Sequence, residues 1–96
     1  MKSKTIVPPL VMKYYTEAKQ KLQPLRVEYE QTVKAAFARN ATDDEIEVIE
    51  DQRRNQIDTV LNFNVFRGVT ELTQDERNAI AVALDYWDDA ILAQQL

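Results

Sequence analysis

Two groups of carboxylates are the side chains of this sequence best suited to chemistry. Three acidic residues fall between positions 47 and 51, and three more between positions 85 and 89. Carboxylate oxygens are the ligands that magnesium and calcium prefer. A helical bundle that binds two metal ions, however, uses inward-facing glutamates together with Glu-x-x-His motifs, and this chain contains no histidine. We therefore predict no metal site and interpret both groups as solvated helix surface: Glu47, Glu50 and Asp51, and Asp85, Asp88 and Asp89.

The other side chains that enzymes use are scarce or absent. The chain has no cysteine, its single serine is Ser3, and one glycine is too few for a phosphate-binding loop. Without histidine, a serine nucleophile has no usual activating base. The sequence therefore predicts a protein that is not an enzyme and that holds no cofactor.

Two capping boxes indicate where helices begin. Thr42-Asp43-Asp44-Glu45 and Thr73-Gln74-Asp75-Glu76 both place a threonine at the N-cap, a glutamate three residues later and further acidic charge in the first turn. The apolar spacing that follows each box predicts helices over about 43–66 and 74–94. Arg53 interrupts the apolar stripe of the first of these helices. Either it makes a buried polar contact or, as is commoner, its stem lies on apolar surface and its head reaches water.

A third apolar stripe predicts a helix over about residues 9–40, ahead of the other two. Pro24 lies inside it, and an internal proline removes a backbone hydrogen bond and clashes one turn back. The stripe stays in register across Pro24, which favours one kinked helix, with two shorter helices as the alternative. Its members follow steps of three and four: Val11, Tyr15, Ala18, Leu22, Leu25, Tyr29, Val33 and Ala36.

These segments predict an all-α fold, a small three-helix bundle, or four helices if the first is broken at Pro24. We expect a single domain over 1–96 with residues 1–8 as a flexible tail. The alanine-rich flank of the last helix fits either packing within the bundle or a homodimer interface. No apolar run approaches the ~20 residues that span a bilayer, and no signal peptide is recognisable, so we expect a cytoplasmic protein that does not enter membranes.

Charge is distributed unevenly. Residues 1–40 carry eight basic and three acidic side chains, a net of +5, and residues 41–96 carry four basic and thirteen acidic ones, a net of −9. The simplest interpretation is that the basic first helix lies against acidic partners in its own bundle. Alternatively, the asymmetry steers docking between molecules. As a further alternative, the first helix binds nucleic acid through Lys13, Lys19, Lys21, Arg26, Lys34 and Arg39, or the acidic second helix imitates nucleic acid.

Apolar residues outside the stripes are candidates for contact with a partner. By spacing, Val27, Val48, Phe66 and Leu92 point away from the predicted core. The segment 62–72 either packs back over the end of the bundle or forms an apolar patch. We expect a partner to bind Phe63, Val65, Phe66, Val69 and Leu72. The functional prediction is a non-enzymatic protein-protein interaction module: a small adaptor, assembly factor or inhibitor, of a size that suits an accessory protein of a phage or mobile element.

Overall fold

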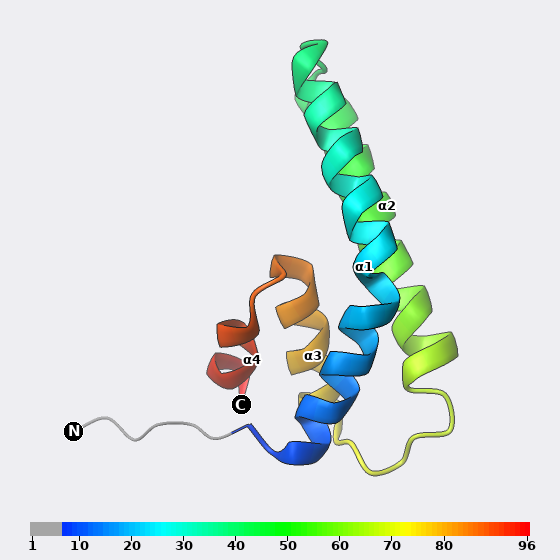
Figure 1. The fold of residues 1–96 in the computed structure, drawn as a ribbon, viewed down its shortest axis with the longest axis vertical. Helices are drawn as coiled ribbons and strands as arrows, with labels where there is room; N and C mark the ends of the chain where they lie inside the picture. The colour runs from blue at the N-terminus through cyan, green and yellow to red at the C-terminus, as the bar shows by residue number, and fades with distance from the viewer. Residues whose placement is uncertain (1–6) are drawn as a thin grey trace, which may run out of the picture.

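A computed structural model describes residues 7–96, and every regular element in that part of the chain is helical. Two long helices, α1 (Pro9–Ala38) and α2 (Asp43–Val60), run side by side and are joined by a short turn (Figure 1). A π-helical turn, η1 (Leu61–Val65), extends α2. Two shorter helices, α3 (Gln74–Tyr86) and α4 (Asp89–Gln95), follow and pack against one end of the pair. The all-helical prediction is confirmed. The predicted tail falls mainly on residues 1–6, which lie outside the described part.

Helix α1 is one element with Pro24 inside it, so the chain is not divided there. It begins at Pro9, where a missing N–H removes no helical hydrogen bond. It ends at Ala38, two residues earlier than expected. Asn40 then adopts a left-handed conformation (φ 55°), and the amide of Ala41 donates to the carbonyl of Ala36 at 2.9 Å. This is a Schellman closure, and asparagine accepts its left-handed position with little strain.

Helix α2 begins at Asp43 as predicted, behind a formed capping box. Its α-helical geometry ends at Val60 instead of continuing to Phe66, because the following turn widens and the amide of Phe66 donates to the carbonyl of Leu61 at 2.7 Å. A π turn contains one more residue than an α turn, so the faces after Leu61 shift by about one position. The prediction that Phe66 points outward is therefore wrong: it is 7% exposed.

The predicted helix 74–94 is two helices. Its start at Gln74 is confirmed, but α3 ends at Tyr86, and the C-cap residue Trp87 adopts a left-handed conformation (φ 54°). The Asp88 side chain then accepts from the amide of Ala90 at 3.0 Å and caps α4. The chain therefore has a fourth helix because the predicted last helix is divided after Tyr86, and not because the first helix is divided at Pro24. Because α4 starts in a new direction, Leu92 is completely buried, and its predicted outward position is wrong.

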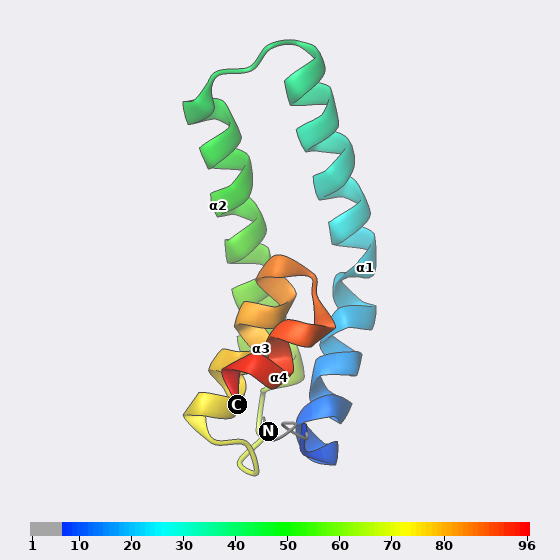
Figure 2. The ribbon, with the colours of Figure 1, turned by 90° about the vertical axis from the view of Figure 1, so that its left-hand side faces the viewer.

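The hydrophobic core lies at the end of the hairpin that α3 and α4 cover. Ile80, Ala83 and Leu84 of α3 are completely buried, and so is Leu92 of α4. Side chains from α1, α2 and the 61–72 segment surround them: Val11, Tyr15, Ala18, Leu22, Ile57, Leu61, Val65, Phe66 and Leu72. The two views of the ribbon agree that the other end of the α1–α2 pair extends past α3 and α4 (Figures 1 and 2).

Candidate protein-binding surface

The part of the α1–α2 pair beyond the cover of α3 and α4 is the distinctive surface of this fold. We call residues 25–56 the distal hairpin. At 1.5 Å per residue, the thirteen residues of α3 span ~20 Å, whereas the thirty residues of α1 span ~45 Å. Among the buried core residues of the described chain, Ala36 is the only one in the distal hairpin. Within residues 7–96, the two helices there have no third layer of the kind that buries them at the other end (Figure 2).

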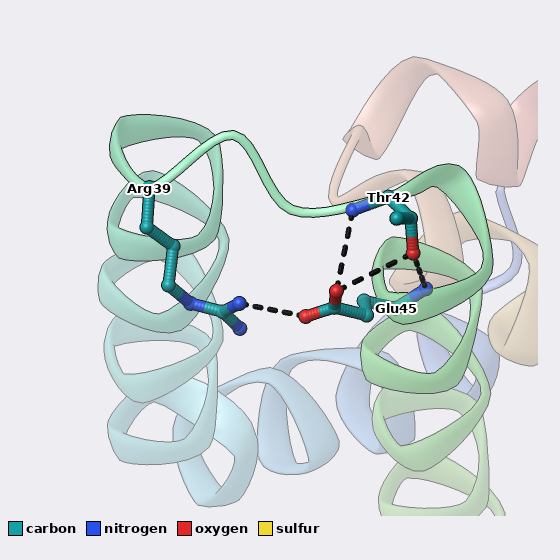
Figure 3. A network of polar contacts seen from close by, with 3 residues as sticks. All are labelled: Arg39, Thr42 and Glu45. Carbon is teal, nitrogen blue, oxygen red and sulfur yellow. Dashed lines mark hydrogen bonds and ion pairs between the residues drawn. The ribbon is translucent and has the colours of Figure 1, made fainter.

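The tip of the distal hairpin is held by polar contacts (Figure 3). Nη1 of Arg39 donates to Oε2 of Glu45 at 2.6 Å, which joins the end of α1 to the start of α2. Thr42 caps α2 and accepts from the Glu45 amide at 3.3 Å. The Arg39 guanidinium, followed by the Thr42 backbone N–H, lowers the pKa of Glu45. The turn therefore sets the spacing of the two helices without a third helix.

One face of the distal hairpin contains a groove of about 540 Å³ between α1 and α2, with a lining of polar and apolar side chains. Tyr29 and Thr32 of α1 and Ile49 of α2 line it, together with glutamines of both helices. Most of its α1 residues, such as Glu28 and Ala35, lie across the helix from Arg26, which contacts Trp87. The groove therefore opens on the side away from α3. The full lining is Leu25, Glu28, Tyr29, Gln31, Thr32, Ala35, Ile49, Gln52, Arg53 and Gln56.

The opposite face continues the surface on which α3 packs. On α1, the Arg26 guanidinium lies over the Trp87 ring, 5.5 Å from its centroid. Positions seven and eleven residues further along a helix return to the same side. Those positions are Val33, which is half-buried, and Phe37, which is 62% exposed. An apolar row of α1 thus runs past Trp87 into solvent.

On α2, the same side is acidic. Arg54 and Arg53 both lie against Asp85 of α3. Glu50 and Glu47 stand four and seven residues before Arg54, and half-buried Ile46 stands seven before Arg53. By helical periodicity they share the face that turns toward α3. We call Val33, Phe37, Ile46, Glu47 and Glu50 the uncovered face.

Trp87 marks the lower boundary of the uncovered face. Two cations of α1 lie over its ring, with Lys19 Nζ 5.3 Å and the Arg26 guanidinium 5.5 Å from the ring centroid. Lys19 also donates to Oδ1 of Asp89 at 2.7 Å, and the Tyr15 hydroxyl donates to the same oxygen at 2.5 Å. The bond from Lys19, followed by that from Tyr15, lowers the pKa of Asp89, while burial first and then Asp89 raise the pKa of Tyr15. These contacts attach the start of α4 to α1.

Arg53 makes the buried polar contact that was the less common of its two predicted roles. Its side chain is 12% exposed, and its Nε is buried without a hydrogen-bond partner among the described residues. Nη1 donates to the backbone carbonyl of Asp85 at 2.6 Å, and the guanidinium stacks over Tyr29, 4.8 Å from the ring centroid. Nη2 lies 2.9 Å from Oδ1 of Asp85, at ion-pair distance but without hydrogen-bond alignment.

The predicted partner-binding segment is mostly part of the core. Val65, Phe66 and Leu72 are buried, and Val69 is half-buried; of that predicted set Phe63 alone is strongly exposed, at 74%. The Arg77 guanidinium lies over the Phe66 ring and donates to the carbonyl of Val69. Of the two alternatives for segment 62–72, the structure has the one that packs back over the bundle end: it follows the π turn, and Arg77 covers Phe66. The other two outward predictions hold: Val27 is 43% and Val48 is 55% exposed.

Half of the cations predicted for nucleic acid are engaged within the chain. Lys19 pairs with Asp89, Arg26 with Glu30 at 2.9 Å, and Arg39 with Glu45. The remaining three, Lys13, Lys21 and Lys34, form no ion pair with the described residues. Two pairs, Lys19–Asp89 and Arg39–Glu45, join the basic part of the chain to the acidic part, which was the simplest interpretation of the charge asymmetry.

Neither carboxylate group gathers into a metal-binding cluster within residues 7–96. Glu47, Glu50 and Asp51 lie along α2, whereas Asp85 binds Arg53, Asp88 caps α4 and Asp89 binds Lys19 and Tyr15. In the same residues, no helix is both long and apolar enough to cross a membrane.

Comparison with known proteins gives no family assignment: no protein-family model, curated protein or solved structure matches this chain.

Sequence reasoning missed Phe37 as a surface residue. The unequal lengths of the predicted helices were the available signal, since a helix over 74–94 cannot cover the whole of one over 9–40.

Proposed function

We propose that this chain is a non-enzymatic protein-binding module, an adaptor, assembly factor or inhibitor, and that it binds its partner through the distal hairpin. One observation carries the proposal: two helices extend past their third layer with apolar side chains exposed on them. Phe37, on the side that α3 covers lower down, is 62% exposed, and Ala36 is the one fully buried residue of this region; Val48, on the outer side of α2, is 55% exposed.

The physical argument concerns what two helices can bury. When two helices pack together, each buries one strip of its surface against the other. An apolar strip beside that contact is buried only if a third element packs on it. Helices α3 and α4 pack against the end of the α1–α2 pair that carries the core, whereas no helix of the described chain packs against the distal hairpin beyond them. Exposed aromatic side chains surrounded by polar residues are typical of the centre of protein interfaces.

The nucleic-acid alternatives have less support. Three of the six candidate cations are neutralised by Asp89, Glu30 and Glu45. For an acidic mimic, Asp43, Asp44 and Glu45 occupy the first turn of α2, where negative charge stabilises the helix dipole whatever the function.

Site-specific photo-crosslinking in the source cell tests the proposal. A photoreactive residue replaces Phe37 in one variant and Gln94, an exposed residue of α4, in the other. We expect a discrete adduct from position 37 and none from position 94. The captured protein, once purified, should bind the unmodified chain and lose at least tenfold in affinity for Phe37→Asp. No adduct at 37, or identical adducts at both positions, would reject a distal-hairpin interface.

A further inference from the structure

The uncovered face leaves room for a third helix of definite length. Arg26 lies level with Trp87, where the cover by α3 ends, and Ala38 ends α1 twelve residues later. Twelve residues of α-helix span ~18 Å, or about three turns. A helix placed here would extend the layer that α3 begins.

We propose that the occupant is an amphipathic helix of a partner protein whose apolar stripe is flanked by lysine or arginine. This inference rests on the proposed function and specifies the chemistry of its partner. Phe37, Val33 and Ile46 would receive the apolar stripe, and the acidic row of α2 would receive the basic flank.

The apolar part of the uncovered face is suited to a helix stripe. Val33 and Phe37 stand four residues apart on α1, and Ile46 stands in the first turn of α2, after the short connection that joins the two helices. Val33 and Ile46 are half-buried, whereas Phe37 is 62% exposed on a backbone that is already helical. An anchor that changes little on binding loses little conformational entropy.

The charge beside this apolar row is one-sided. Residues 43–51 contain six acidic side chains and no basic one. Glu47 and Glu50 of the uncovered face form no ion pair with any described residue. Cations on a docking helix would neutralise them, whereas acidic flanks would be repelled.

The same charge argues against a second copy as the occupant. Two-fold pairing of uncovered faces would bring both copies of the 43–51 segment into one interface. On α1, the residues beside the uncovered face carry charges of both signs. Glu30 already pairs with Arg26, and Lys34 supplies one further cation. A self-pair would therefore place many carboxylates opposite few bases.

Designed peptides of eighteen residues test the inference. All carry the same leucine stripe on an alanine background with blocked ends, and their flanks are lysine, glutamine or glutamate. Calorimetry at 150 mM salt gives affinity and stoichiometry, and amide chemical shifts locate the site. We expect the lysine peptide to bind one to one at least tenfold more tightly than the glutamine peptide, with shifts centred on Val33, Phe37 and Ile46, and the glutamate peptide not to bind.

Matched charge reversals separate the site from general attraction between an acidic protein and a basic peptide. Glu47→Lys with Glu50→Lys changes the uncovered face. Glu17→Lys with Glu28→Lys makes the same change in net charge on the other side of α1. At 150 mM salt, charges more than about 8 Å apart are largely screened. We expect the first double variant to lose at least tenfold in affinity and the second less than twofold, with circular dichroism and melting temperature showing that both fold.

The alternatives give different results. Equal losses in both double variants, or shifts outside the uncovered face, would reduce the inference to diffuse attraction and reject it. Equal binding of all three peptides at the uncovered face would reject the basic partner while the proposed function stands. A dimer in sedimentation that Phe37→Asp dissociates would make a second copy the occupant. Absence of any peptide binding also overturns the inference, and crosslinking at Phe37 then decides the proposed function separately.

Discussion

Arg53 of α2 and Asp85 of α3 form the most buried ion pair among the described residues. The side chains are 12% and 27% exposed, and Arg53 also binds the backbone carbonyl of Asp85. Arg54 approaches the same carboxylate at 3.6 Å but is 57% exposed. The pair connects the hairpin to the short third helix near the level where the cover of the hairpin ends.

Substitution of Arg53 should therefore cost stability in a way that substitution of Arg54 does not. A lysine cannot reach both the carbonyl and the carboxylate of Asp85 while stacking on Tyr29. We expect Arg53→Lys to lower the free energy of unfolding by about 1–2 kcal/mol, and Arg54→Lys by less than about 0.5 kcal/mol. Urea denaturation followed by circular dichroism measures both. Equal losses would show that the buried geometry of Arg53 has no particular importance.

Truncation of apolar side chains should distinguish the core from the uncovered face. Leu84 is completely buried and Phe37 is 62% exposed. We expect Leu84→Ala to lower the free energy of unfolding by about 2–5 kcal/mol because it leaves a cavity, and Phe37→Ala by less than about 1 kcal/mol. Thermal melts and urea titrations test this. A large loss for Phe37→Ala would mean that its role is in folding and not in binding.

The capping box of α3 should stabilise the fold measurably. Thr73 Oγ1 accepts from the Glu76 amide at 3.1 Å, and the Thr73 amide donates to the Glu76 carboxylate at 2.8 Å. Thr73→Ala removes the side-chain oxygen that accepts from the Glu76 amide, and we expect it to lower the free energy of unfolding by about 1 kcal/mol. Thr73→Ser should retain most of this stability. Thr70→Ala, at an exposed position outside the helices, serves as the control in the same denaturation series and should change stability little.

Acid should weaken the attachment of α4 through Asp89. The bonds from Lys19 and Tyr15 lower the pKa of this carboxyl below its ordinary 3.8. A group whose pKa is lower in the folded state stabilises the fold above its unfolded pKa, and that contribution is lost as the pH falls through the folded pKa. We expect Asp89→Asn to be less stable at pH 7 and to show a smaller loss of stability below about pH 4.

Urea denaturation of wild type and Asp89→Asn between pH 7 and pH 2 measures this difference. Lys19→Gln removes the main cause of the lowered pKa and should flatten the acid dependence as well. If Asp89→Asn keeps the full acid dependence of wild type, the carboxylate does not contribute through these two bonds.

Local signals in the sequence determined the helical class and the helix starts. Capping boxes are made of residues three apart, so Thr42 and Thr73 located Asp43 and Gln74 as first helical residues without knowledge of any tertiary contact. The stripe of α1 likewise identified Val11, Tyr15, Ala18 and Leu22 as core. Periodicity within one helix depends on backbone geometry alone, which explains why these predictions were correct.

Other features depended on contacts between distant residues. Trp87 ends α3 in a left-handed conformation while its ring contacts Lys19 and Arg26, some sixty residues away in the chain, and no local pattern contains that contact. The π turn after Val60 similarly moved Phe66 inward, where Arg77 covers it. The break at Trp87 also ended the third layer level with Arg26, well short of Phe37. The sequence by itself determined which segments are helical and which side of each is apolar, because those follow from short-range geometry. Only the tertiary structure decided how far one helix covers another, because that depends on where distant side chains meet.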